Sequence, residues 1–362
     1  MNITVEHSDF HRILELVARV STKHLTLPVL QCVHLEAKGN TVIVRGTNLE
    51  IGIEGSLPVT QVQEGSVSVP AATLLQTISL LSQKEVTLKT EGDVLVVQTK
   101  TSKTSINTVP SDEFPNIPKL DKDGQKIQGK NFANGIKTAA FAASQSSIKP
   151  ELGSVYLFQK KEQTLTCVAT DSFRLVEKTI PQQQVALESG ILIPYKNALE
   201  LARVCDLFEE DPLLFINENQ CALQFKDLYI TSRLTTGTFP DYESIIPKEF
   251  VTHTTLLTVD FQNALKRTNI FLNKFMKLGM SVSGNKLILS SVGDNGTTTE
   301  DVNASSEGDD ITLNFNQRYV QEILPYVTDE SITIHFAGIG RPIVIESVHD
   351  RSLRYLVMPM NK

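Results

Sequence analysis

Titratable side chains are spread along this 362-residue chain without the spacing that catalysis or metal binding requires. The 7 histidines show no metal-ligand spacing, and the 4 cysteines include no C-x-x-C pair. The sequence signatures of nucleotide-binding loops, zinc-protease helices and nucleophile elbows do not occur. We therefore predict no catalytic residue, no metal and no cofactor. An enzyme whose site is assembled from scattered residues, such as Asp171 and Arg174, stays open as an alternative.

The composition indicates a soluble protein with more than one hydrophobic core. Hydrophobic residues make up 41% and charged residues 21% of the chain, and 362 residues are enough for two or three domains. Cys32, Cys167, Cys205 and Cys221 lie far apart, which is typical of reduced, buried thiols. No basic segment followed by an apolar stretch opens the chain, and no later run is long enough to cross a bilayer. We expect a cytoplasmic protein that does not contact membranes.

Phosphate binding is the chemistry that the charged residues favour. The net charge of −7 argues against coating nucleic acid by bulk charge, but it allows a basic stripe on one surface. In the first helical segment Phe10, Ile13 and Val17 form an apolar stripe, and basic residues fall on a different face. Ordinary solvation explains such residues on any one helix, but their recurrence favours phosphate contact, which gives affinity without reading sequence. These residues are Arg12, Arg19, Lys23, Lys137, Lys149, Lys196, Arg203, Lys266, Arg267 and Lys274.

Three segments with a strand–turn–strand outline recur at a constant spacing. Their central turn residues are Asn48, Asp171 and Asp294, so both intervals are 123 residues (171 − 48 and 294 − 171). Asn and Asp suit such turns because their side chains accept hydrogen bonds from nearby backbone amides. The three segments are 41–57, 164–180 and 286–302.

Each repeat also contains two helical segments. The first opens at Asp9, Asn131 or Asp260, which we predict as N-cap residues. The second begins near Pro70 and Pro194 in the first two repeats, where a missing amide hydrogen does little harm. The common order predicts three copies of an α+β unit, although three similar domains without a shared task stay possible. The predicted domains are 1–126, 127–252 and 253–362.

Four segments resemble the bacterial DNA polymerase III beta subunits, the beta sliding clamps. The resemblance covers essentially the whole chain in the family's order. It implies an α+β fold of three repeated clamp-type domains, with helices lining a central hole and antiparallel sheets outside, in a ring-shaped head-to-tail homodimer. The segments are LPVLQCVHL at 27–35, VATDSFRL at 168–175, TSRLTTGTFPDYESIIP at 231–247 and YLVMPM at 355–360.

The function that this resemblance implies is that of a DNA polymerase processivity factor, a non-catalytic accessory subunit of the polymerase III holoenzyme. A closed ring around double-stranded DNA cannot dissociate sideways, so its phosphate contacts can be weak and independent of sequence. By its position in the family pattern, His24 joins the DNA-facing residues. The alternative is a clamp-derived peptide-binding scaffold that does not encircle DNA.

The resemblance also implies a cleft between domains two and three for short linear peptide motifs. The implied partners are the DNA polymerase III alpha subunit, the clamp loader, other polymerases and repair proteins. Leu, Ile and Met side chains suit an adaptable apolar groove, and we expect deletion of 356–362 to weaken peptide binding while the dimer stays assembled. The implied lining residues are Leu152, Thr170, Ser172, Phe173, Arg174, Leu175, Pro240, Ser244, Ile245, Gly340, Pro342, Leu356, Met358, Pro359 and Met360.

For the seam between subunits, the resemblance points to apolar residues of domain one against apolar residues of domain three. Two lysines could also face two acids across the seam, although plain surface charge explains these four residues equally well. The implied seam residues are Leu75, Ile78, Lys100, Lys103 and Ile106 of domain one, and Phe271, Leu272, Glu300 and Asp301 of domain three.

Overall fold

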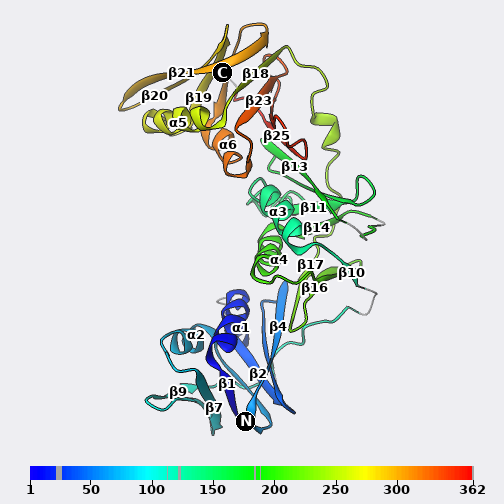
Figure 1. Cartoon of the computed structure of the whole chain (residues 1–362), viewed down its shortest axis with the longest axis vertical. Coiled ribbons are helices and arrows are strands. Elements are labelled where there is room, and N and C mark those ends of the chain that lie inside the picture. Colours follow the sequence, from blue (N-terminus) through cyan, green and yellow to red (C-terminus); the bar gives the residue numbers. More distant parts are fainter. Residues whose placement is uncertain (22–26, 112, 121–123, 183–184, 188, 361–362) are drawn as a thin grey trace. The chain divides into compact units, whose positions relative to one another are not determined.

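The computed structural model describes residues 1–21, 27–111, 113–120, 124–182, 185–187 and 189–360. The chain divides into two compact units (Figure 1). The first unit comprises Met1–Gly129 and Arg203–Leu234, and the second comprises Lys130–Ala202 and Thr235–Lys362. The middle of the chain therefore contributes residues to both units.

Antiparallel sheets form most of the first unit. Its helices are α1 (His7–Val20) and α2 (Ala71–Ser79), with a short 3-10 helix η1 (Pro28–Gln31). Its strands are β1 (Asn2–Glu6), β2 (Cys32–Lys38), β3 (Thr41–Thr47), β4 (Ile51–Pro58), β5 (Thr60–Gln63), β6 (Gly65–Pro70), β7 (Glu85–Glu91), β8 (Val94–Gln98), β9 (Lys103–Asn107), β10 (Gln125–Lys126), β15 (Leu213–Ile216), β16 (Gln220–Gln224) and β17 (Leu228–Arg233). One sheet has the order β5-β1-β7-β8-β9, and the other has the order β10-β15-β16-β17-β4-β3-β2-β6.

One long antiparallel sheet runs through the second unit. Its strands are β11 (Ser154–Phe158), β12 (Thr164–Thr170), β13 (Arg174–Pro181), β14 (Ile191–Pro194), β18 (Thr252–Leu257), β19 (Lys277–Ser283), β20 (Lys286–Gly293), β21 (Gly296–Gly308), β22 (Ile311–Asn316), β23 (Ser331–Phe336), β24 (Ile343–Ser347) and β25 (Leu353–Val357). Their order is β14-β11-β12-β13-β25-β24-β23-β18-β21-β20-β19-β22. The helices are α3 (Gly129–Ala140), α5 (Thr258–Thr268) and α6 (Gln317–Gln321), with 3-10 helices η2 (Glu243–Ile245), η3 (Asn269–Phe271) and η4 (Leu324–Tyr326). Helix α4 (Tyr195–Leu207) begins in this unit, and its residues from Arg203 on belong to the first unit.

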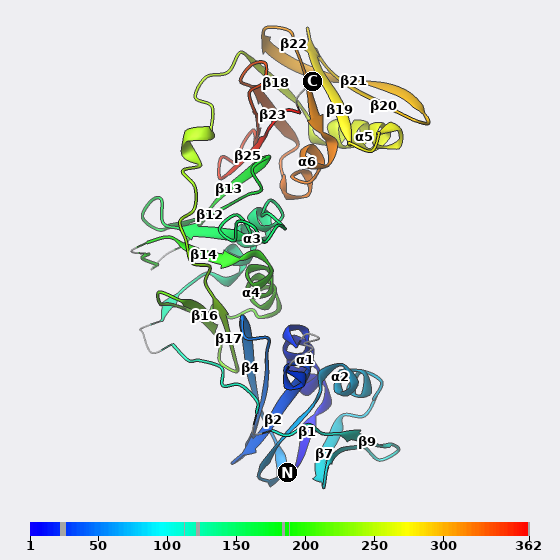
Figure 2. The same cartoon turned by 180° about the vertical axis from the view of Figure 1, so that it is seen from behind.

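Helices lie against the sheets in both units. In the first unit α1 packs on β3 and β4, and in the second α5 lies across β20 and β21 (Figures 1 and 2). The predicted apolar stripe of α1, which includes Phe10, Ile13 and Val17, is buried. A Cβ on Gly46 of β3 would lie 2.7 Å from the carbonyl oxygen of Val17, so only glycine permits this approach.

The helix starts differ in part from the prediction. Asp9, Asn131 and Asp260 are each the third residue of their helix, so the prediction that they are N-caps is wrong. In α1 the cap is Glu6, whose carboxylate accepts the amide of Asp9 at 2.9 Å. β1 and β18 run directly into α1 and α5, so the last strand residue takes the cap position. The first-turn acids Asp9 and Asp260 still favour the helix electrostatically.

The second helices and the central turns follow the sequence prediction. α2 and α4 begin directly after Pro70 and Pro194. The Asn48 side chain accepts the amides of the second and third residues after it, at 3.0 and 2.9 Å. Asp171 does the same at 3.0 and 3.1 Å. Asp294 lies in the tight hairpin turn between β20 and β21.

Two strand pairs join residues from different predicted domains. β17 pairs with β4 from Leu228↔Gly55 to Ser232↔Ile51, and β13 pairs with β25 from Arg174↔Val357 to Lys178↔Leu353. Backbone hydrogen bonds therefore continue across the predicted boundaries near residues 126 and 252. Those boundaries stay predictions, because the two compact units divide the chain at other positions.

The four cysteines are buried thiols that form no disulfide with one another, as predicted. Burial raises the pKa of Cys32 to about 11 and the pKa of both Cys167 and Cys221 to about 12, so these thiols stay protonated at neutral pH. In the part of the chain that the structure describes, no helix has the length and apolar character needed to cross a membrane. Among the same residues, no cluster of His, Cys, Asp or Glu side chains has an arrangement that could hold a metal ion.

Candidate functional site

The turn between β12 and β13 presents an exposed aromatic side chain. The hydroxyl of Thr170 donates to the carbonyl oxygen of Arg174 at 2.6 Å and accepts the amide of Ser172 at 3.1 Å. Ser172 has a φ of 77°, a left-handed conformation that is uncommon for serine. The tightly bonded turn leaves Phe173 58% exposed.

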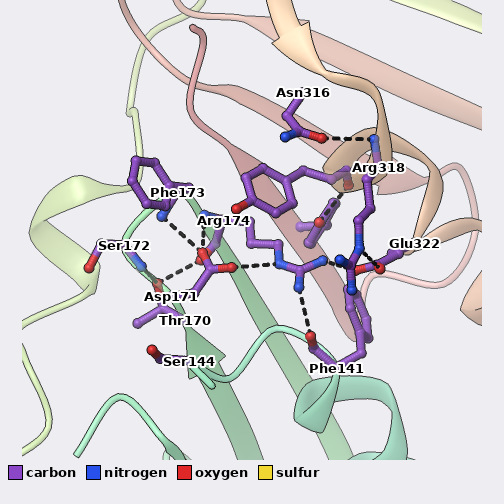
Figure 3. Close-up of polar contacts among 12 residues, drawn as sticks. Phe141, Ser144, Thr170, Asp171, Ser172, Phe173, Arg174, Asn316, Arg318 and Glu322 are labelled. Atoms are coloured by element: carbon purple, nitrogen blue, oxygen red, sulfur yellow. Dashed lines mark hydrogen bonds and ion pairs between the residues drawn. The ribbon is translucent and has the colours of Figure 1, made fainter. Parts of the chain in front are cut away.

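Arg174 is the centre of a buried polar network at the base of this turn. Its Nε donates to Asp171 at 3.0 Å, and a terminal nitrogen donates to Glu322. Figure 3 shows these two carboxylates approaching the guanidinium from opposite sides. The other terminal nitrogen donates to the carbonyl oxygen of Phe141 at 2.9 Å, and the guanidinium lies 4.7 Å from the centre of the Tyr319 ring. The network connects the β12–β13 turn to α6 and to the end of α3.

Partners of opposite charge compensate the burial of the charged groups in this network. Burial alone would raise the pKa of Glu322, but hydrogen bonds from Arg174 and Arg318 outweigh it and hold the pKa below its usual value. Burial also acts to lower the pKa of Arg174, and attraction to Tyr355 and Glu322 reverses that effect. Both groups are therefore ionised at neutral pH, and their paired charges stabilise the network.

An apolar cluster lies beside the network. Half-buried side chains pack against it, such as Ile246 from the segment between β17 and β18 and Met358 from the C-terminal segment. The amide of Met358 donates to the carbonyl oxygen of Phe173 at 2.8 Å, and the amide of Met360 donates to that of Asn314 at 2.7 Å. These bonds hold the C-terminal segment next to the Phe173 turn. The buried members of the cluster are Val168, Leu175, Leu192, Phe239, Tyr242, Val344 and Leu356.

The predicted cleft residues fall into three groups by exposure. Leu175 and Leu356 face each other across the β13–β25 pair with their side chains buried, and their place in the cleft stays a prediction. Leu152, Thr170 and Arg174 are also buried. The exposed residues are Ser172, Phe173, Pro240, Ser244, Ile245 and Gly340, and the half-buried ones are Pro342, Met358, Pro359 and Met360.

The predicted DNA-facing residues lie mainly on exposed helix surfaces. Those that are exposed are Arg12, Arg19, Lys149, Lys196, Lys266, Arg267 and Lys274. Lys137 and Arg203 are half-buried, and the Nε of Arg203 is enclosed without a hydrogen-bond partner in the described structure. Arg267 forms an ion pair with Glu300 at 2.6 Å, so its charge is partly neutralised. Lys23 and His24 lie outside the described residues.

The predicted seam residues differ in exposure, and the seam itself stays a prediction. Ile78 is 0% exposed and Ile106 is also buried, with both side chains in the core of the first unit. Leu75, Phe271 and Leu272 are half-buried, and Lys100 and Lys103 are both exposed. Glu300 and Asp301 already form ion pairs with Arg267 and Lys286 on the same chain.

Sequence reasoning missed two exposed apolar residues near the predicted seam residues in sequence. Leu80, just after α2, is 86% exposed, and Ile270 in η3 is 67% exposed. Both follow the end of a helix, where they no longer belong to its buried stripe. An aliphatic residue directly beyond an amphipathic helix was the signal that could have found them.

Comparison with solved structures establishes the class of the fold. The DNA polymerase III subunit beta of Pseudomonas aeruginosa superimposes with a TM-score of 0.94 at 24% identity, covering 100% of both chains. The DNA polymerase sliding clamp of Bacillus subtilis gives a TM-score of 0.94 at 23% identity, covering 100% of this chain and 99% of the other. The chain therefore has the sliding-clamp fold.

Sequence comparison establishes the family. Models of the N-terminal, central and C-terminal domains of the DNA polymerase III beta subunit match residues 1–118, 126–241 and 243–361. Beta sliding clamps of Staphylococcus epidermidis and Staphylococcus aureus are 28% and 27% identical, each aligned over 99% of both chains. The chain consists of three clamp domains and belongs to the DNA polymerase III beta subunit family. The predicted assignment as a sliding clamp is confirmed, and the scaffold alternative is not favoured.

Proposed function

We propose that two copies of this chain form a closed head-to-tail ring around duplex DNA and tether a DNA polymerase to it. The observation that carries the proposal is the match to the sliding-clamp fold over the whole chain. In the proposed ring the chain is not itself an enzyme, acts in the cytoplasm and has domains at 1–126, 127–252 and 253–362. Its contribution to replication is topological, because a closed ring cannot leave DNA sideways.

Two strand edges support the proposed seam. β9 pairs with β8 and has no second strand partner among the described residues. Residues 296–303 of β21 pair with β20 only, because β18 takes up residues 304–308. A free edge can accept a strand from another chain, and two different edges give a head-to-tail contact that can close into a ring. Leu80 and Ile270 would add apolar contact beside the paired strands.

The basic helix residues support contact with DNA inside the ring. Arg12 and Arg19 on α1 and Lys266 on α5 are exposed in an otherwise acidic protein. Such side chains neutralise phosphates without contacting base edges, so binding is independent of sequence and weakens as salt concentration rises. Weak contacts of this kind permit sliding.

Retention on DNA should depend on the topology of the DNA. We expect the protein, loaded by a clamp loader with ATP, to stay bound to nicked circular DNA in 0.3 M salt. Cutting that DNA once with a restriction enzyme should release nearly all of it, because the ring slides off the ends. Gel filtration of labelled protein with the DNA measures both states. Equal retention, or equal loss, on the two forms would contradict encirclement.

We further propose that peptide motifs of polymerase III alpha, the clamp loader, other polymerases and repair proteins bind beside the Phe173 turn. Phe173 and Ile245 are exposed apolar side chains on this surface. Met358 and Met360 lie half-buried in the adjacent segment, and methionine side chains repack easily around different partners. Arg174 would position the turn rather than contact the peptide, because its side chain is buried and each of its three guanidinium nitrogens already donates a hydrogen bond.

Phe173→Ala should weaken binding of a labelled C-terminal peptide of the polymerase alpha subunit by about tenfold, as expected for loss of an aromatic anchor. Fluorescence anisotropy measures the affinity. Phe275→Ala is the matched control, because Phe275 is similarly exposed but lies after η3, outside the proposed cleft. An equal loss in both variants, or no loss in either, would argue against a peptide site at the Phe173 turn.

The structure also changes the deletion that tests this cleft. Leu356 and Val357 belong to β25, which pairs with both β13 and β24. Deleting 356–362 would therefore damage the sheet. Deleting 358–362 removes the segment beside Phe173 and leaves β25 complete, so it should lower peptide affinity without changing the assembly state.

A further inference from the structure

The turn between β3 and β4 in the first unit repeats the geometry of the Phe173 turn. The hydroxyl of Thr47 donates to the carbonyl oxygen of Ile51 at 2.9 Å and accepts the amide of Leu49 at 3.0 Å. Leu49 has a φ of 74°, close to the 77° of Ser172. The two turns therefore share their hydroxyl bonds, their Asx bonds and their left-handed residue.

The surroundings of the two turns also correspond. The amide of Arg233, at the end of β17, donates to the carbonyl oxygen of Glu50 at 2.8 Å, as that of Met358 donates to Phe173. A connector with the sequence FPNI at 114–117 matches FPDY at 239–242, and its Ile117 is buried as Tyr242 is. The first unit thus contains a second cleft with the same backbone construction.

The side chains of this first-unit cleft differ from those at the Phe173 turn. A cavity of about 90 Å³ lies there, lined by Ile51, Gly52 and Ile117 and bordered by Leu49 and Arg233. Ile51 takes the place of Arg174, so no ion pair fills the base. Gly52 takes the place of Leu175, and the Ile117 side chain packs directly over it, since a Cβ there would lie 3.1 Å from Ile117.

The charge at the mouth of the cavity indicates what would bind. Arg233 is exposed and forms no ion pair with any described residue. Glu50, in the adjacent turn, already takes part in an interaction. The cavity volume of about 90 Å³ corresponds to roughly three water molecules, each of which takes up roughly 30 Å³ in the liquid. This is about the size of one aliphatic side chain. A carboxylate beside that side chain would complement Arg233.

We propose that this first-unit cleft is a second peptide-docking site, for an extended segment with one aliphatic residue next to an aspartate or glutamate. The analogy between the two clefts rests on the function proposed for the Phe173 turn. The cavity and the exposed Arg233 are observed independently of that function. Two such different clefts would let one subunit hold two partners with different motifs, one anchored by large apolar groups and one by an acidic–aliphatic pair.

Two capped peptides test the proposal on the intact protein with labelled Ile and Leu methyl groups. We expect Ac-Ser-Asp-Leu-Ser-NH2 to shift the methyl signals of Ile51 and Ile117 saturably, and Ac-Ser-Lys-Leu-Ser-NH2 to bind about fivefold more weakly, as one exposed ion pair allows. Arg233→Glu should reverse this preference. Arg341→Glu, an exposed arginine in the β23–β24 loop, is the control and should leave the preference unchanged.

Absence of a saturable shift at Ile51 and Ile117, or the same preference in wild type and Arg233→Glu, would overturn the proposal. Thermal unfolding of Arg233→Glu verifies that the variant is folded, which its exposed position favours. Methyl signals of Leu175 and Leu356 report the Phe173 cleft when the polymerase peptide is added. Failure of the second site and failure of the proposed polymerase site are therefore observed at different residues.

Discussion

Ile270→Asp is expected to leave each subunit folded and to convert the dimer into monomers. The side chain is 67% exposed in η3, so the change removes little from the core of the second unit. At the proposed seam it would bury a carboxylate without a partner, which costs several kcal/mol. We expect the dimer dissociation constant to rise by at least about a hundredfold. Sedimentation equilibrium over a concentration series measures it.

Ile339→Asp is the matched control for this variant. Ile339 is 80% exposed in the loop between β23 and β24, away from η3 and from both free strand edges in the sequence. It should leave the dimer constant unchanged, whereas Leu80→Asp on the opposite side of the seam should act like Ile270→Asp. A normal dimer constant in Ile270→Asp would remove η3 from the interface. Retention of that variant on circular DNA would remove the seam from the mechanism.

Arg174→Met should destabilise the folded protein by about 3 kcal/mol, because it removes the buried guanidinium from between two half-buried carboxylates. Methionine keeps much of the apolar stem, so the loss reports mainly the guanidinium. Asp171 and Glu322 would each lose a charged hydrogen bond, and the carbonyl oxygen of Phe141 would lose its donor. Urea unfolding at pH 7 measures the free energy of unfolding.

Comparison with Arg318→Met separates the effect of burying a charged group from the effect of the charge itself. Arg318 also pairs with Glu322, but its side chain is 59% exposed, so its loss should cost less than about 0.5 kcal/mol. The pKa of Glu322 is lowered in the folded state, so its stabilisation is present above its ordinary value of 4.5 and lost as pH falls through the folded pKa. The difference between wild type and Arg174→Met should therefore shrink below pH 4.5. Equal costs for the two arginines would show that Arg174 has no special role.

Local features of the fold were predictable from the sequence. Asn48 and Asp171 form their turns with amides two and three residues away, so a pattern of a few residues contains the whole interaction. The prolines before α2 and α4 act locally in the same way. The N-cap prediction failed because Asp9 looks like a cap in isolation, whereas its helix starts two residues earlier, directly from β1.

Features that depend on distant residues were not predictable. Arg174 and Glu322 are 148 residues apart, and nothing near either residue indicates the other. Ile78 and Leu80 are only two residues apart, yet one is buried and the other is almost fully exposed because α2 ends between them. The family pattern predicts a region for the seam, and the structure distinguishes apolar residues there that fill the core from those that remain on the surface.

The β4–β17 and β13–β25 pairings have a mechanical consequence. Each is a ladder of five residue pairs within a continuous sheet, so bending there would stretch several backbone hydrogen bonds together. The proposed seam has fewer covalent constraints, because no chain passes through it. A clamp loader that opens the proposed ring would therefore separate it most easily at the interface between subunits. We expect deformation to concentrate at that interface, while the β4–β17 and β13–β25 pairings each move as a rigid body.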